Sequence, residues 1–115
     1  MQLSRDFVVS IDQLSNSRQQ SGELYLEFLR VPAMSAGLYE LAAGARDPQS
    51  PHGEDEIYYV VEGRGQIRIG DVDYAVAAGS VIFVPARVEH RFHSIEATLR
   101  ILVVFAPAEG GETGA

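Results

Sequence analysis

The sequence predicts an all-β domain, built as a sandwich or a barrel. Short runs rich in Val, Ile, Leu, Tyr and Phe recur along the chain with Gly, Pro or Asp between them, which is the pattern of many short strands joined by turns. The 115 residues are enough for one compact core and too few for two ordinary domains. A content of 46% hydrophobic and 22% charged residues is typical of a globular chain. We therefore expect a single domain over residues 1–108.

About eight strands are expected, together with a short piece at the N-terminus. The strands lie at Glu23–Val31, Ala36–Leu41, Glu56–Val61, Gln66–Ile69, Val72–Val76, Ser80–Val84, Val88–His93 and Thr98–Phe105, and the N-terminal piece lies at Phe7–Ser10. Each of these runs is rich in β-branched or aromatic residues. The one helix expected is a turn or two around Ile11–Gln20, where the sequence is polar.

Glycine and proline mark the ends of several of these strands. The runs "QIRI" and "VDYAV" alternate apolar and polar residues about Gly70–Asp71, which predicts a hairpin with a two-residue turn. Gly63 and Gly65 predict a second tight turn after Val61. Pro85 ends the run "GSVIFVP" because it lacks the N–H that a strand ladder needs.

The two ends of the chain carry no strong structural signal. The C-terminal residues "AEGGETGA" are acidic and rich in glycine, so we expect a flexible tail over Glu109–Ala115. The N-terminal residues "MQLSRDFVVSIDQL" contain no apolar run of signal-peptide length, and no later run approaches the length of a membrane span. A cytoplasmic location without membrane contact is the expectation.

The composition excludes several kinds of chemistry. The net charge of −7 comes from 16 acids and 9 bases, and those bases are scattered singly, which argues against nucleic acid binding. All of the bases are arginines, so no lysine is available for Schiff-base chemistry. The chain has no cysteine, and therefore no disulfide, thiol nucleophile or thiolate metal ligand.

His52 and Glu56 are the first candidates for a functional site. Their spacing of four suits one face of a helix, but Glu56 leads into "IYYVVEG", which favours a strand. On a straight strand the two residues would lie roughly 13 Å apart, so they can meet only if the chain turns between them. Gly53 supplies such a turn, with Glu54 and Asp55 expected to stay in solvent at its tip.

The strand that begins at Glu56 has a period of two, which separates its residues into two faces. Glu56, Tyr58 and Val60 share one face, and Ile57 and Tyr59 share the other. A carboxylate on the inner face needs a proton, a partner or a metal ion. A third ligand is available in "PARVEHRFHS", where His90 and Phe92 share one face and His93 lies on the opposite one, so one histidine at most should point inward.

These residues resemble the two signature motifs of the cupin superfamily. In Gly44–Gly63, His52 falls on the second histidine of the first motif, and Glu56 and Gly63 fall on its glutamate and closing glycine. In Gly79–Ser94, Pro85 and His90 fall on the proline and the histidine of the second motif. The resemblance implies a jelly-roll barrel, also described as a double-stranded β-helix, with a divalent transition metal (Fe, Mn, Zn or Ni) inside.

The chain departs from the family pattern at three positions. Ser50 stands at the place of the first histidine, Arg87 at that of a glycine and Ser94 at that of an asparagine, while Asp47 and Gln49 are candidate substitutes for the missing ligand. A serine hydroxyl is a poor metal ligand, whereas an amide oxygen can bind the harder metals. We therefore predict a metal site of His52, Glu56 and His90, completed by Gln49 or water.

The function predicted on this basis is binding of a small organic molecule at the metal, with or without a reaction. Dioxygenase, isomerase and decarboxylase chemistry all stay open for the resemblance, as does a metal-free binding or sensor module. Tyr58 and Phe92 are candidate pocket residues. Because Ile57 and Tyr59 are apolar and point outward, and because the family resemblance points the same way, a homodimer is expected.

Overall fold

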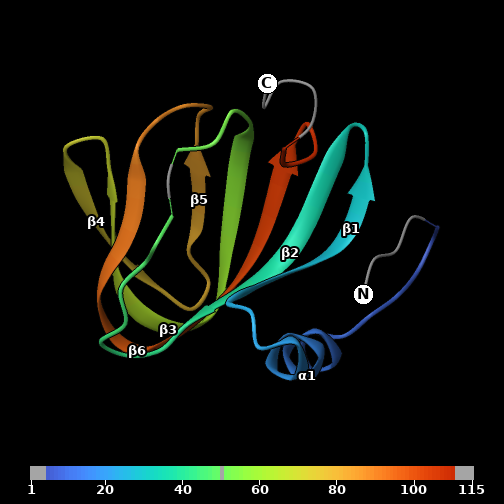
Figure 1. The fold of residues 1–115 in the computed structure, drawn as a ribbon. Coiled ribbons are helices and arrows are strands. Elements are labelled where there is room, and N and C mark those ends of the chain that lie inside the picture. The colour runs from blue at the N-terminus through green and yellow to red at the C-terminus, as the bar shows by residue number, and fades with distance from the viewer. Residues whose placement is uncertain (1–4, 50, 111–115) are drawn as a thin grey trace.

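The computed structural model describes residues 5–49 and 51–110 and confirms the all-β prediction. Figure 1 shows a curved antiparallel sheet with one helix packed beside it. Within the described residues the elements are α1 (Ile11–Ser21), β1 (Tyr25–Val31), β2 (Met34–Leu41), β3 (Asp55–Ile69), β4 (Val72–Ala77), β5 (Val81–Val84) and β6 (His90–Ala106). The strand order is β1-β2-β6-β3-β4, and β5 pairs with β3 outside this path.

Two long strands, β3 and β6, form the centre of the sheet. Each joins two of the expected strands, and they pair antiparallel from Asp55–Ala106 at one end to Ile69–His90 at the other. The first half of β3 also pairs with β5, and its second half pairs with β4. The hairpin at Gly70–Asp71 is confirmed, because Ile69 faces Val72 across it and Gly70 has a φ of +60°.

The prediction of a tight turn at Gly63 and Gly65 is wrong. β3 continues through both glycines as a strand whose pairing with β6 shifts register between Val60 and Gln66. Gly63 has a φ of +104°, and a Cβ placed on it would overlap the backbone of Thr98 in β6. These glycines therefore allow a bend and a close backbone approach inside a continuous strand pair. The conformational freedom of glycine alone had indicated a chain reversal.

The N-terminal strand expected at Phe7–Ser10 is also wrong, since residues 7–10 form no strand. Ser10 instead begins helix α1 through a capping box with Gln13, and Gly22, with a φ of +76°, ends it. The helix itself is confirmed. Phe7 still packs edge-on against Phe28 of β1, with 6.1 Å between ring centroids. No helix among the described residues has the length and apolar character needed to cross a membrane.

The side chains of the sheet separate into two apolar layers. The inner layer fills the barrel with buried residues of β2 to β6, including Tyr58, Ile67, Phe92 and Ile101, and Tyr25 of β1 packs against it. The outer layer lies under α1, where Leu14 packs with Phe28, Ala36 and Leu38. Figure 1 shows that α1 lies near β1 and β2, and most of its contacts are with these two strands.

The predicted tail begins with two residues that are attached to the barrel. The backbone N–H of Glu109 donates to Ser35 Oγ at 2.8 Å, and that of Gly110 donates to Glu54 Oε2 at 3.0 Å. The Arg30 guanidinium donates to the Glu109 carbonyl. The rest of the predicted tail, 111–115, lies outside the described residues.

The bend in β3 can be tested by comparing two glycines with similar backbone conformation. Gly79 has a φ of +94° with nothing within 4 Å of an added Cβ, whereas Gly63 has the β6 backbone in that place. We expect Gly79→Ala to lower the free energy of unfolding by about 1 to 2 kcal/mol through backbone strain alone. Gly63→Ala should lower it by at least about 2 kcal/mol more, because two paired backbones must separate. Urea denaturation measures both, and equal losses would contradict the close approach.

Candidate metal centre

His52, Glu56 and His90 converge at one end of the barrel. One potential ligand atom from each lies within 4.8 Å of the other two. Glu56 lies near the start of β3 and His90 opens β6, while His52 lies in the loop between β2 and β3. The predicted turn at Gly53 exists, and it is fixed by two hydrogen bonds from the segment before β6: Arg87 N–H donates to the His52 carbonyl at 2.6 Å, and Ala86 N–H donates to Asp55 Oδ1 at 2.9 Å.

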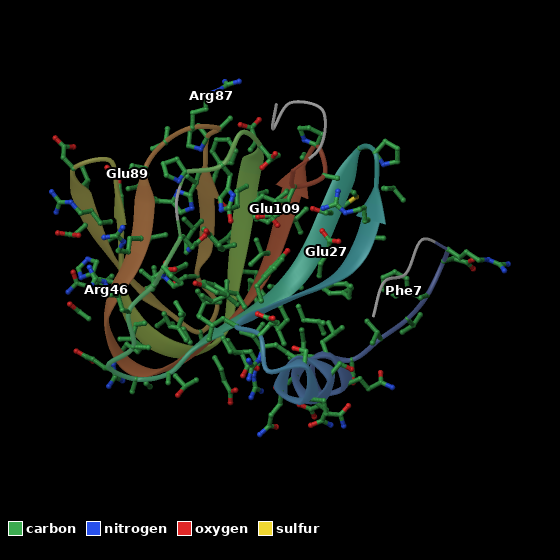
Figure 2. All side chains as sticks on the ribbon, in the orientation of Figure 1. Phe7, Glu27, Arg46, Arg87, Glu89 and Glu109 are labelled. Carbon is green, nitrogen blue, oxygen red and sulfur yellow. The ribbon has the colours of Figure 1, made fainter. Side chains whose placement is uncertain are left out.

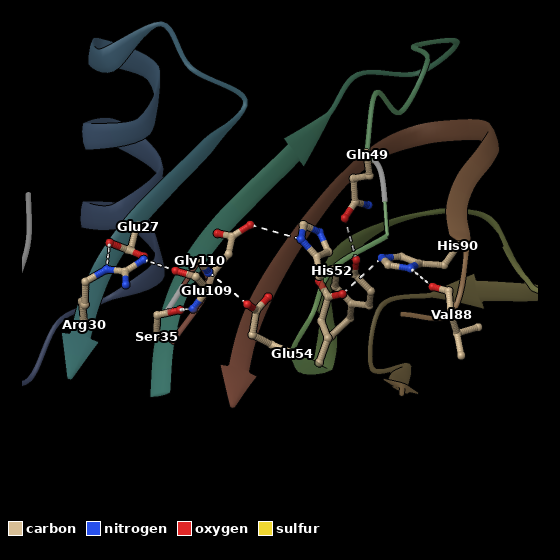
Figure 3. Close-up of polar contacts among 12 residues, drawn as sticks. Glu27, Arg30, Ser35, Gln49, His52, Glu54, Val88, His90, Glu109 and Gly110 are labelled. Carbon is tan, nitrogen blue, oxygen red and sulfur yellow. Dashed lines mark hydrogen bonds and ion pairs between the residues drawn. The ribbon is translucent and has the colours of Figure 1, made fainter. Parts of the chain in front are cut away.

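The acid at the tip of this turn is not in solvent as expected. Glu54 is 3% exposed and accepts the hydrogen bond from Gly110 N–H, whereas Asp55 is exposed as predicted. The cause is the chain beyond β6, which returns over the turn and covers Glu54. Figure 3 shows Glu54 and Gly110 side by side, next to Glu109.

The two histidine rings are oriented so that their Nε2 atoms face the same space. His90 Nδ1 lies 2.9 Å from the carbonyl oxygen of Val88, so Nδ1 carries the proton and Nε2 keeps its lone pair in the neutral ring. His52 Nδ1 lies 3.4 Å from Glu109 Oε2. Both contacts are drawn in Figure 3. An acceptor at Nδ1 is the usual arrangement for an imidazole that binds a metal through its other nitrogen.

Four buried polar atoms in this cluster have no hydrogen-bond partner in the described part of the chain. They are His52 Nε2, His90 Nε2 and both carboxylate oxygens of Glu56. His90 Nε2 lies 3.1 Å from Glu56 Oε1, an ion-pair distance without hydrogen-bond geometry. Buried polar atoms are rarely left unsatisfied, because each one loses its hydration. Two imidazole nitrogens and a carboxylate are ligands that divalent transition metals accept, so the residues fit a metal ion.

Glu56 also sets the protonation of its neighbours. Burial lowers the pKa of His90, but the Glu56 carboxylate and the Val88 carbonyl outweigh that effect, so the pKa of His90 is raised above its ordinary value. Burial, followed by the charge of Glu56, raises the pKa of the Tyr58 hydroxyl. Without a metal, the centre therefore favours a proton on His90, and a metal ion would replace that proton.

The proposed fourth ligand, Gln49, lies in a hydrogen-bonded chain beside the three. Its Oε1 accepts from the Tyr58 hydroxyl at 2.8 Å, and its Nε2 donates to Asp47 Oδ2 at 2.7 Å. Asp47 is 1% exposed and also accepts from the Tyr39 hydroxyl and from Phe92 N–H. Asp47 thus anchors the loop and is not directed at the metal centre. Ser50 lies outside the described residues, and ligation by Gln49 stays a prediction.

A cavity of about 140 Å³ adjoins the three candidate ligands. His52 and Glu56 form one side of it, and aromatic rings form much of the rest. The aromatic lining residues are Tyr25, Tyr39, Tyr58 and Phe105. Tyr58, a predicted pocket residue, lines the cavity, whereas Phe92 packs edge-on behind it with ring centroids 5.0 Å apart.

Six of the ten lining residues are not among the site residues predicted from the sequence, and Glu109 and Tyr25 belong to these six. Glu109 falls in the segment expected to be a flexible tail, and no local signal indicates that it returns to the barrel mouth (Figure 2). Tyr25 lies inside an expected strand, and the alternation of that strand could have indicated an inward side chain. His93 lies on the outer face as expected, where its Nε2 is 2.7 Å from Asp73 Oδ1.

Comparisons with known proteins give both the fold and the family. A Bacillus halodurans protein of known structure has a TM-score of 0.76 at 21% identity, over 90% of this chain and 82% of that one. An RmlC-like cupin from Shewanella frigidimarina has a TM-score of 0.65 at 24% identity, over 73% of this chain and 75% of that one. At these identities the likeness shows a shared fold.

The assignment of the chain to a family rests on sequence similarity. An uncharacterised protein of Streptomyces coelicolor is 50% identical over 99 residues, which are 86% of this chain and 94% of that protein. The model of the cupin domain family matches residues 37–105, the segment that holds all three candidate ligands. The chain therefore belongs to the cupin family.

Proposed function

We propose that this cupin binds one divalent transition metal through His52, Glu56 and His90, and binds a small organic molecule beside it. The observation that carries the proposal is the convergence of His52, Glu56 and His90, which among the described residues hold four buried ligand atoms without a hydrogen-bond partner. Fe, Mn, Zn and Ni all accept two imidazoles and a carboxylate. The cavity next to this set has room for a small molecule only.

Three protein ligands leave coordination positions open for water or for an oxygen of the organic ligand. A bound metal ion would polarise that oxygen or activate water or dioxygen. Val88 and Glu109 hold the His90 and His52 rings in place, and Tyr58 and Phe105 keep the site shielded from water. Dioxygenase, isomerase and decarboxylase reactions are all compatible with such a centre, and the fold does not choose among them.

The second candidate function is a binding or sensor module without metal. Ser50 replaces the first histidine of the family motif, and the oxygen of Gln49 is already used by Tyr58. In this form the raised pKa of His90 would keep an imidazolium paired with Glu56 inside the barrel.

The metal content of the purified protein distinguishes the two candidates. Untagged protein reconstituted with each of the four metals should hold about one ion per chain. His52→Ala, Glu56→Gln and His90→Ala should each lower the affinity by at least about tenfold, because each removes a ligand. Elemental analysis and competition with a chelator measure the content and the affinity.

The matched control is His93→Ala, which removes a histidine from the outer face near the same end of β6. This variant should bind metal as the wild-type protein does. If the wild-type protein holds no metal after reconstitution at neutral pH, the metal-free binding module becomes the better account.

Metal affinity should fall as the pH falls. Both imidazoles must be neutral to act as ligands, and the raised pKa of His90 means that protons compete with the metal at a higher pH than for an isolated histidine. Between about pH 8 and pH 6 we expect the apparent dissociation constant to increase, by up to about tenfold per unit for each proton displaced. Isothermal titration at several pH values measures this slope, and a flat profile would argue against histidine ligation.

The outer face of the sheet carries an exposed apolar patch, defined as Ile57, Tyr59, Val81 and Phe83. These residues pair across β3 and β5, and they are between 43% and 70% exposed. Helix α1 covers β1 and β2 on the outer face and leaves this part open. A second copy of the chain is the partner proposed for the patch, because a self-complementary apolar surface suits a two-fold dimer.

We expect the wild-type protein to sediment as a dimer and Phe83→Glu to sediment as a monomer, because a charge in the centre of the interface would lose its hydration. Val72→Glu is the control, since Val72 is also exposed but lies at the β3–β4 hairpin. Analytical ultracentrifugation at micromolar concentration measures both. A monomeric wild-type protein would contradict the dimer.

A further inference from the structure

The wall of the cavity beside His52 contains an acid and an unsatisfied hydroxyl. Glu109 lines the cavity, and its side chain is 31% exposed. Tyr25 also lines it, and its hydroxyl is buried without a hydrogen-bond partner among the described residues. The other two tyrosines of the lining differ, because Tyr39 donates to Asp47 and Tyr58 donates to Gln49. Of the three lining tyrosines in the described chain, Tyr25 is thus the one whose hydroxyl lacks a partner.

The position of Tyr25 is enforced by the fold. A Cβ on Gly37, in the neighbouring strand β2, would overlap the Tyr25 ring. The ring also packs edge-on against Tyr39 and Phe105, with centroids 6.2 and 6.3 Å away. Glycine at position 37 thus leaves the space in which the ring lies, and the ring is held in one position at the cavity wall.

The position of Glu109 is fixed through its backbone. Its N–H donates to Ser35 and its carbonyl accepts from Arg30, while the next residue is bound to Glu54. These contacts, visible in Figure 3, leave the Glu109 side chain directed toward His52. A segment held at three points presents one carboxylate at the mouth of the cavity.

The charges around this wall are negative. Glu56, Glu54 and Glu27 place negative charge near the partly buried Glu109 carboxylate. No arginine is among the described residues that line the cavity, and Arg30 is engaged by a two-pronged pair with Glu27, at 3.0 and 2.7 Å. A carboxylate that is partly desolvated among other acids is stabilised by a cation.

We infer that this cavity recognises a small ligand with an ammonium group, which Glu109 and Tyr25 bind while an oxygen at the other end of the ligand faces the metal centre. The inference rests on the proposed metal site and adds the substrate class. An ammonium donates to the carboxylate and to the hydroxyl oxygen, and the rings of Tyr25 and Phe105 favour a cation over their faces. The formal charges also match, because a divalent metal balances Glu56 and Glu109, so a zwitterion leaves the site neutral.

Three simple probes test the inference on zinc-reconstituted protein: β-alanine, propionate and succinate. They share a carboxylate for the metal and differ at the far end, which is an ammonium, a methyl group or a second carboxylate. We expect β-alanine to bind about tenfold more tightly than propionate, and succinate to bind most weakly. Ligand-observed NMR or calorimetry at millimolar concentration measures the three affinities.

Two variants test whether Glu109 and Tyr25 cause the preference. Glu109→Gln should reduce the advantage of β-alanine over propionate to about threefold or less. Because Glu109 also contacts His52, the two affinities are compared at saturating zinc, so that a change in zinc affinity does not enter their ratio. Tyr25→Phe should reduce the advantage by a smaller factor. Glu96→Gln and Tyr74→Phe are the matched controls, because both side chains are exposed and neither lines the cavity. Neither control should change the affinity ratio of β-alanine to propionate.

The outcomes separate this inference from the proposed function. If the protein retains zinc and propionate binds, but β-alanine binds no better or succinate binds best, the metal site stands and the ammonium preference is wrong. The preference is also wrong if β-alanine does not bind at millimolar concentration, or if Glu109→Gln leaves the affinity ratio unchanged. If wild-type protein retains no zinc, the proposed function fails first, and this inference fails with it.

Discussion

The pairing of β3 with β6 is the constraint on which the rest of the structure depends. Along this pair His90 is opposite Ile69, which is thirteen residues from Glu56 and would be about 40 Å away on a straight strand. In the folded chain His90 Nε2 lies 3.1 Å from Glu56 Oε1. Both strands must therefore bend back on themselves, and Gly63, where β6 comes too close for any side chain, is where β3 does so. The three candidate ligands meet because the sheet closes.

The alternation of side chains along a strand explains what could be predicted from the sequence. Glu56, Tyr58, His90 and Phe92 were all expected to point inward, and all four are buried. This succeeds because the period of two is a local property, which holds however the strand is bent. The family spacing added the choice of His90 over His93, which alternation alone left open. The convergence of the three candidate ligands was therefore predictable before their distances were known.

The failures have a common physical cause, which is contact between distant segments. A glycine with positive φ serves equally well in a chain reversal and in a bent strand, and only the approach of Thr98 decides which one Gly63 forms. Glu54 looked like a solvated turn residue because the residue that covers it, Gly110, is 56 positions further along the chain. Glu109 was placed in a tail for the same reason. Local composition reflects only the neighbours of a residue in the sequence, whereas the environments of Gly63, Glu54 and Glu109 are set by residues far away in the sequence.

The polar residues of the site lower the stability of the folded chain. The barrel interior is otherwise filled with residues such as Ile, Val and Phe. Three apolar side chains of similar size would pack there without the loss of hydration that a buried carboxylate and two imidazoles suffer. The surrounding structure makes the arrangement tolerable: Val88 orients one ring, Glu109 lies beside the other, and Asp47 ties down the loop that carries Gln49. Each of these supports belongs to a different segment, which is how a short chain holds three polar groups in one place against their preference for water.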